Sequence, residues 1–116
     1  MASMREPTFL ILTALAERAR HGYGLIQEVG ALSGGEVVLG AGTLYGALDR
    51  LAEQDLIAVD REEAVDGRLR RYYRLTDQGA AVLSAEAERL RRHAAAAAER
   101  LHRRAQTAAQ TGPVTA

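Results

Sequence analysis

The stretch RLRRYYR, residues 68–74, carries four arginines and two tyrosines without an acidic residue. Guanidinium groups bind phosphate oxygens through paired hydrogen bonds, so a run of this kind can hold a nucleic-acid backbone. The run follows Asp66-Gly67, a dipeptide that favours a tight hairpin turn. We therefore expect Arg68 and Arg70, which lie nearest the turn, to contact phosphates, with a weaker contribution from Arg71.

An ordinary solvated strand is the alternative interpretation of this basic run. Arg71 and Arg74 would then pair with Asp60, Glu62 or Glu63 on the facing strand. Cross-strand ion pairs of this kind are common in antiparallel ribbons. The two interpretations can hold together for different arginines.

The second candidate is GAGTLYGALDRL, residues 40–51, which places glycines in the first half of an amphipathic helix. If the leucines of this helix face the core, Gly42 and Gly46 leave bare backbone on the opposite face, flanked by Thr43, Tyr45 and Arg50. A helix that enters the major groove needs such a narrow face, and its free N–H groups and positive dipole end favour phosphate. Alternatively, the glycines allow close helix packing, or are tolerated at a cost of about 1 kcal/mol each.

Two carboxylates, Asp49 and Glu53, lie farther along the same exposed face. Negative side chains are repelled by phosphates, so we expect the C-terminal half of this helix to stay away from the DNA backbone.

Helical periodicity predicts the elements that position these residues. Pro7 begins a first, largely buried helix, a second helix spans about 23–32, and a third spans about 41–54. Alternating apolar residues on both sides of Asp66-Gly67 then predict a two-stranded ribbon. Thr76 is a suitable N-cap for a last helix that begins at about Asp77 and continues beyond Arg104.

The last helix carries an apolar seam with the alternating spacing of a coiled coil. No other element of the chain is long enough to cover this seam, so we expect homodimerisation, with help from the first helix. A lone alanine-rich helix that needs little packing is the alternative. The expected dimerisation residues are Phe9, Leu12, Leu83, Ala87, Leu90, Ala94, Ala97 and Leu101.

These elements define a mainly α (α+β) fold. We predict a winged helix-turn-helix over residues 1–76 with a two-stranded wing, a long C-terminal dimerisation helix over 77–106, and a disordered tail over 107–116. The 116 residues suit one globular domain, and no apolar run approaches the roughly 20 residues that span a bilayer. We expect a cytoplasmic protein that does not bind membranes.

Catalysis and metal binding have little support in the sequence. The chain has no cysteine, and its three histidines lack the spacing of a metal site. His21 is better placed to cap or pack at a helix start. We therefore expect no enzyme activity, no metal and no cofactor.

Three segments, HGYGLIQEV, GTLYGALDRLAEQDLI and DGRLRRYYRLTDQG, occur in this order. Together they resemble the PadR family of bacterial transcriptional regulators over roughly residues 7–80, and the short chain with one C-terminal helix is similar to the family's smaller subgroup. The resemblance implies a homodimer that binds double-stranded DNA at a palindromic operator. It also implies repression of transcription and, in some members, release by a small-molecule effector, which the sequence does not identify.

The family's recognition-helix motif matches Gly42, Thr43, Leu44 and Tyr45, which implies DNA contacts for Thr43 and Tyr45 and a core position for Leu44. With Tyr23 from the preceding helix, the expected DNA-binding residues are Tyr23, Gly42, Thr43, Tyr45, Arg50, Arg68, Arg70 and Arg71. The family often has Ser-Pro before this motif, where this chain has Gly40-Ala41. Loss of a side-chain N-cap would weaken the helix start by about 1 kcal/mol.

The alternative function is a winged-helix protein-interaction module without DNA binding. Its support is the formal net charge of zero, which gives no global basic signature, together with the acidic residues on the third helix. Steep salt dependence would distinguish phosphate binding from a protein partner.

Overall fold

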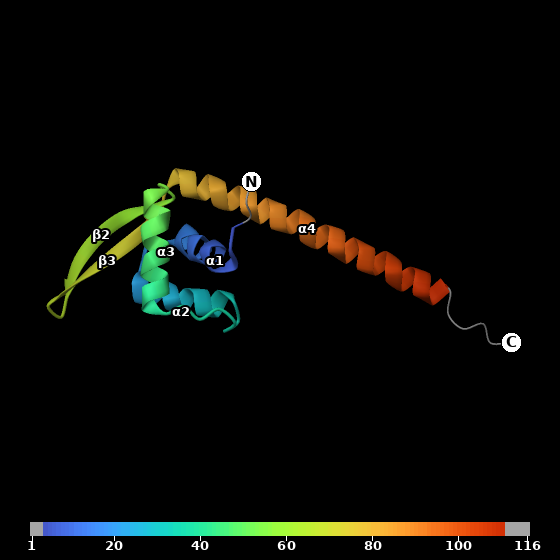
Figure 1. Cartoon of the computed structure of the whole chain (residues 1–116), viewed down its shortest axis with the longest axis horizontal. Coiled ribbons are helices and arrows are strands. Elements are labelled where there is room, and N and C mark those ends of the chain that lie inside the picture. Colours follow the sequence, from blue (N-terminus) through green and yellow to red (C-terminus); the bar gives the residue numbers. More distant parts are fainter. Residues whose placement is uncertain (1–3, 111–116) are drawn as a thin grey trace. The chain divides into compact units, whose positions relative to one another are not determined.

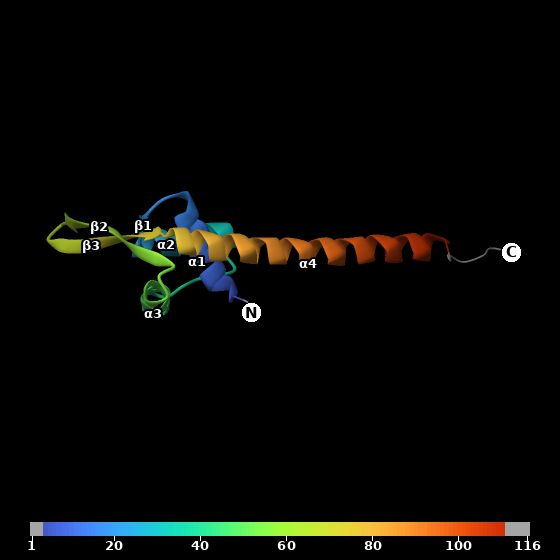
Figure 2. The ribbon, with the colours of Figure 1, turned by 90° about the horizontal axis from the view of Figure 1, so that it is seen from above.

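A computed structural model describes residues 4–110 and contains the expected winged helix. Three helices come first, α1 (Glu6–Glu17), α2 (Gly22–Leu32) and α3 (Ala41–Glu53), with the short strand β1 (Arg20–His21) between α1 and α2. A hairpin of β2 (Ile57–Val65) and β3 (Arg68–Leu75) follows, and α4 (Asp77–Gln110) ends the described chain. Both views show the hairpin extending beyond the three helices (Figures 1 and 2).

The sheet has three antiparallel strands in the order β1-β3-β2, whereas the sequence predicts only the two-stranded ribbon. The additional strand pairs Arg20 with Tyr73 and His21 with Tyr72. The hairpin turn is as expected, because Asp66 and Gly67 both have positive φ values, 50° and 76°, as a type I′ turn requires. A register shift between Val59 and Arg61 interrupts the alternation along β2.

Leucines at helical spacing build the core beneath these elements. Leu44, Leu48 and Leu51 of α3 are buried as expected, together with Ala47. The other buried apolar residues are Ile11, Leu12, Ala14, Leu15, Leu25, Val29, Leu39, Leu56, Ile57 and Tyr73. The face of α3 that carries Gly42 and Tyr45 is thereby left outside the core.

Arg20 is a buried cation that joins the first two helices. Its Nε donates to the carbonyl oxygen of Ala14 at 3.0 Å, and its guanidinium lies 2.9 Å from the carboxylate of Glu17 and 3.7 Å from that of Glu28. A buried charge needs such partners because it has lost its water. The contact with Ala14 also satisfies a carbonyl near the end of α1.

The start of α4 is fixed by the predicted cap. The Thr76 hydroxyl accepts a hydrogen bond from the N–H of Gly79 at 2.9 Å and donates to the carbonyl oxygen of Asp55 at 2.6 Å. Gly79 packs so tightly that an added Cβ would lie 2.8 Å from the Leu75 side chain and overlap the Leu56 carbonyl. Glycine is therefore required here for close approach of two backbones.

The helix continues to Gln110, so residues 107–110, which the sequence places in a disordered tail, are helical. Residues 111–116 of that predicted tail lie outside the described residues. The described chain up to Glu86 forms one compact unit, and the remainder of α4 from Ala87 forms a second. The first unit thus extends ten residues beyond the predicted boundary at 76, because Gly79, Leu83 and Glu86 are buried or half-buried in it.

We expect Gly79→Ala to destabilise the protein by about 1–3 kcal/mol, because the methyl group has no space beside the Leu56 carbonyl. Urea denaturation at a fixed protein concentration measures this change. Gly30→Ala is the control, since nothing lies within 4 Å of its added Cβ and alanine favours a helix. Equal stability of the two variants would contradict the close backbone contact.

Candidate nucleic-acid interface

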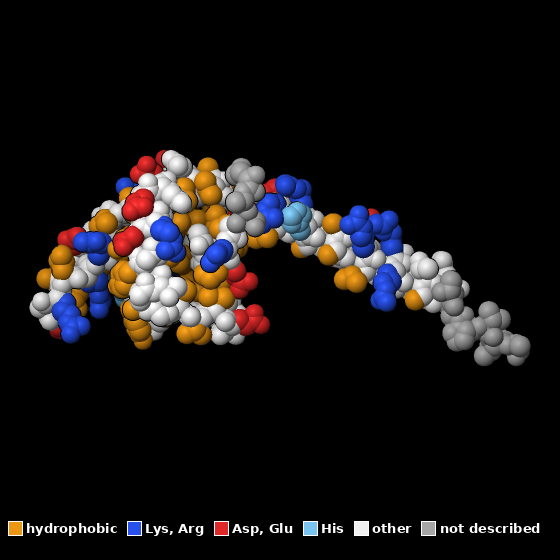
Figure 3. Space-filling view, in the orientation of Figure 1, with side chains coloured by type: hydrophobic (Ala, Val, Ile, Leu, Met, Phe, Trp, Pro, Cys, Tyr) orange, Lys and Arg blue, Asp and Glu red, His pale blue; other side chains and the backbone are white. Residues whose placement is uncertain are grey.

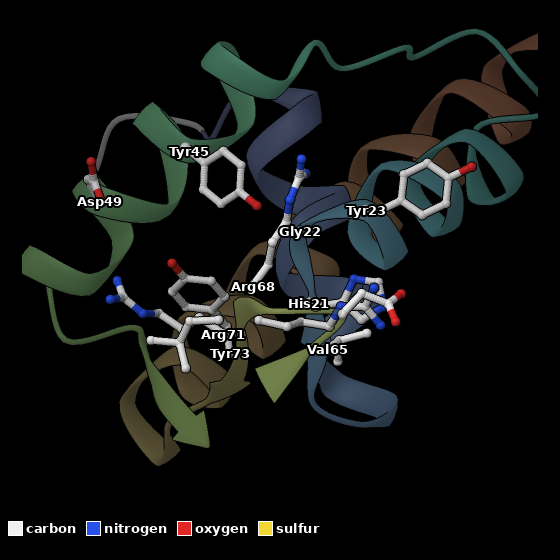
Figure 4. Close-up of a pocket in the computed structure, with 12 residues that line it drawn as sticks. His21, Gly22, Tyr23, Tyr45, Asp49, Val65, Arg68, Arg71 and Tyr73 are labelled. Atoms are coloured by element: carbon white, nitrogen blue, oxygen red, sulfur yellow. The ribbon is translucent and has the colours of Figure 1, made fainter. Parts of the chain in front are cut away.

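A groove of about 950 Å³ separates the hairpin from the helices. Figure 4 shows α3 supplying Tyr45 and Asp49 on one side, with hairpin residues Arg68, Arg71 and Tyr73 on the other. The complete lining is His21, Gly22, Tyr23, Tyr45, Asp49, Val65, Asp66, Arg68, Leu69, Arg70, Arg71 and Tyr73. Five of the expected DNA-contact residues therefore meet in one groove: Tyr23, Tyr45, Arg68, Arg70 and Arg71.

Tyr45 is held in position by a glycine of the neighbouring helix. An added Cβ at Gly22 would lie 2.8 Å from Cζ of the Tyr45 ring and would overlap its hydroxyl. Tyr45 nevertheless stays 47% exposed. The side chain is thus fixed against the start of α2 while it remains open to the groove.

His21 caps α2, as expected, and lies at the inner edge of the groove. Its Nδ1 accepts a hydrogen bond from the N–H of Gly24 at 3.2 Å, and its ring meets Tyr72 edge-on with centroids 5.2 Å apart. Burial lowers the pKa of His21, and the positive charge of Arg70 lowers it further, while Glu63 acts in the opposite direction. These effects favour the neutral ring, which the capping hydrogen bond requires.

The arginines of the hairpin divide into two groups. Arg71 follows the alternative interpretation, because its Nε lies 3.3 Å from the carboxylate of Glu62 on β2. Tyr73 and then Glu62 raise the pKa of Arg71 above its usual value. Among the described residues, Arg68 and Arg70 have no hydrogen-bonding or ion-pair partner, which leaves both available to an anion.

Basic side chains gather over the hairpin in Figure 3. Arg61 of β2 lies over the ring of Tyr72, with its Cζ 3.9 Å from the ring centroid. This cation–π contact and the ion pair of Arg71 hold two arginines against the sheet. Arg68 and Arg70 remain as the candidates for phosphate binding.

Three expected contact residues lie outside the groove lining. Gly42, Thr43 and Arg50 are exposed on α3. The guanidinium of Arg50 lies 3.6 Å from the position of a Cβ at Gly46, an ordinary van der Waals distance, so Arg50 extends along its own helix. The N-cap Gly40 makes no side-chain hydrogen bond, as its residue type predicts.

Asp49 lines the groove, although its charge suggests a position away from DNA. The signal for this placement is present in the sequence, because Asp49 follows Tyr45 by four residues and shares its helix face. His21, Leu69 and Tyr73 also line the groove without having been expected there. Their positions depend on how β1 and the hairpin meet, which no local pattern reveals.

The expected dimerisation residues have different environments. Leu12 is fully buried in the core of its own chain, so its side chain cannot meet a partner and the expectation for this residue is wrong. Phe9 is half-buried, and Leu83 packs against the same core. Beyond Glu86 the seam is exposed, with Leu90 and Leu101 at 40% and 63% and three alanines between or beside them, Ala87, Ala94 and Ala97.

Comparison with known proteins identifies the family. The model of the transcriptional regulator PadR-like family matches residues 11–85, which include both sides of the groove. The chain belongs to this family. Transcriptional regulator Rv3488 of Mycobacterium tuberculosis is 41% identical over 80 residues, which cover 69% of this chain and 71% of that protein.

Solved PadR structures share the fold of this PadR-like chain. A PadR family regulator from Clostridium difficile has a TM-score of 0.70 at 25% identity, covering 84% of this chain and 99% of that one. PadR of Bacillus subtilis, solved in complex with operator DNA, has a TM-score of 0.62 at 22% identity, covering 70% and 47% of the two chains. The winged-helix architecture is thus the established one for the family.

The described part of this PadR-like chain also bears on metal binding and membrane insertion. No group of three or more histidine, cysteine or acidic side chains could hold a metal ion there. No helix within residues 4–110 is long and apolar enough to cross a membrane.

Proposed function

We propose that this PadR-family transcriptional regulator is a homodimeric repressor that binds a palindromic operator. The observation that carries the proposal is the groove, in which the exposed face of α3 and the arginines of the hairpin meet. A winged helix contacts DNA with these same two elements, the helix in the major groove and the wing on the adjacent backbone.

The Bacillus subtilis relative in complex with operator DNA supports DNA as the partner. In this chain, Arg68 and Arg70 would bind phosphates on one side of the groove, while Tyr23 and Tyr45 approach from the helices. Gly42 and Thr43, exposed in the first turn of α3, would lie closest to the bases. Small residues at this position permit close approach of the helix to base edges.

Dimerisation through the exposed part of α4 would bring a second copy of the groove to the same DNA molecule. One winged helix contacts only a few base pairs, and two copies related by two-fold symmetry would place half-sites about one helical turn, roughly 10 bp, or a multiple of it apart. As the family resemblance implies for some members, binding of a small-molecule effector would release the protein from DNA.

A protein-interaction module is the second candidate function, and the charge distribution favours it. Residues 1–86 contain nine arginines against 13 acidic residues, whereas residues 87–116 contain six arginines against two. The basic excess therefore belongs to the distal part of α4, not to the unit that contains the groove. The two candidate functions differ in what the groove binds, which is DNA in the first and another protein in the second.

Selection from a random pool of duplexes by the purified full-length protein tests the proposal. We expect enrichment of a two-fold symmetric sequence whose half-sites are separated by about 10 bp or a multiple. Sequencing of the bound fraction reads both the half-site and its spacing. A pool that shows no enrichment even at low salt would instead support the protein-interaction module.

Arg70→Ala should weaken binding to specific and non-specific duplexes by a similar factor, because Arg70 is expected to hold a phosphate and no base. The slope of log K against log salt should become shallower by about 0.9, the value for one phosphate contact. Titrations at several salt concentrations measure both effects. Arg74→Ala is the control, since Arg74 is exposed on the same strand but does not line the groove. An unchanged slope in Arg70→Ala would remove Arg70 from the interface.

Leu90→Asp should shift the protein toward monomer, because it places a charge in the middle of the exposed apolar seam. Sedimentation over a range of protein concentrations measures the shift. Ala96→Asp is the control, because it adds the same side chain to the same helix on a face away from the seam. Leu90→Asp protein that remains as dimeric as the control would place the interface elsewhere.

A further inference from the structure

Two carboxylates line the groove, Asp66 at the hairpin turn and Asp49 on the helix side. Asp49 lies on α3 one turn after Tyr45, and Arg68, Arg70 and Arg71 line the same groove from the hairpin (Figure 4). The side chain of Asp49 is exposed. The hydrogen bonds and ion pairs within residues 4–110 include none from Asp49, so no described arginine neutralises it.

An unneutralised carboxylate at this position has a large effect on any DNA that enters the groove. Phosphates would be repelled, and the repulsion strengthens as water leaves the interface. Hydrogen-bond donors are the groups that offset this cost. In the major groove, the donors are the exocyclic amino groups, N4 of cytosine and N6 of adenine.

Cytosine is the better match of these two bases. Adenine presents the acceptor N7 beside its amino group, and this acceptor would face the carboxylate. Guanine and thymine present acceptors, O6 with N7 and O4 respectively, so both would be repelled. Cytosine presents its N4 amino group without a neighbouring acceptor on the same base.

We propose that Asp49 determines specificity by accepting a hydrogen bond from N4 of a cytosine at one position of each half-site. This inference rests on the proposed function, because it assumes that α3 enters the major groove. It assigns opposite tasks to the two sides of the groove. Arg68 and Arg70 hold the backbone of any duplex, and Asp49 rejects duplexes that present an acceptor at its position.

Glu53 provides a matched control for this carboxylate. It lies one turn further along α3, is exposed, and does not line the groove. Asp49→Asn and Glu53→Gln each remove one negative charge from the same helix and replace a carboxylate by its amide. Any general electrostatic gain in DNA binding should therefore be similar in the two variants.

The test compares duplexes selected from one random pool by the unaltered protein, Asp49→Asn and Glu53→Gln at the same salt concentration. We expect the unaltered protein and Glu53→Gln to enrich the same half-site with one fixed cytosine. Replacing that cytosine should weaken their binding roughly tenfold, within the usual range for one mismatched base pair. Asp49→Asn should lose this preference, or exchange it for adenine, which pairs with a side-chain amide.

Two outcomes would overturn the inference and leave the proposed function intact. In one, Asp49→Asn enriches the same half-site as the unaltered protein. In the other, Asp49→Asn binds all duplexes more tightly by one common factor, which would show that the carboxylate only repels phosphates. Absence of any enriched sequence with the unaltered protein is a different result, and it would overturn the proposed function together with this inference.

Discussion

The close contact of Gly79 with the Leu56 carbonyl determines where the elements of the groove can lie. Leu56 directly precedes β2 and follows α3, and its carbonyl oxygen also accepts the N–H of Thr76, 3.1 Å away, at the end of β3. Thr76 in turn donates to Asp55, whose φ of 60° is the left-handed turn that ends α3. One junction therefore joins the end of α3 to both strands of the hairpin.

Glycine serves a second purpose at the groove itself. Gly22 leaves free the space beside the start of α2 that the Tyr45 ring occupies, so this side chain lies close to the backbone. The glycines of α3 itself, Gly42 and Gly46, meet no neighbour that would exclude an added Cβ, so they weaken this helix without a packing requirement within the described chain. Their cost in helix propensity, about 1 kcal/mol each, is offset by the burial of the leucines on the opposite face.

The sequence predicts well what depends on periodicity and local chemistry. The leucine spacing of α3, the Asp-Gly turn and the Thr76 cap are all confirmed. It does not predict β1, because two residues carry no period and pair only after β3 is in place. Leu12 is misassigned for a similar reason. The first helix is apolar on several sides, so its sequence does not distinguish the face that packs in its own core from a face that could meet a partner.

The seam of α4 shows how one sequence pattern serves two environments. Leu83 packs against the core of the first unit, while the same spacing continues through Leu90 and Leu101, which are exposed. Each of these exposed leucines leaves apolar surface in water. The free-energy cost is about 25 cal/mol for each Å² of that surface. A second copy is the simplest cover for this seam, because a repeated spacing is complementary to itself under two-fold symmetry. Two-fold symmetry would also give the protein two grooves for the two halves of a palindrome. The apolar periodicity of α4 and the symmetry of the proposed operator would then have the same origin.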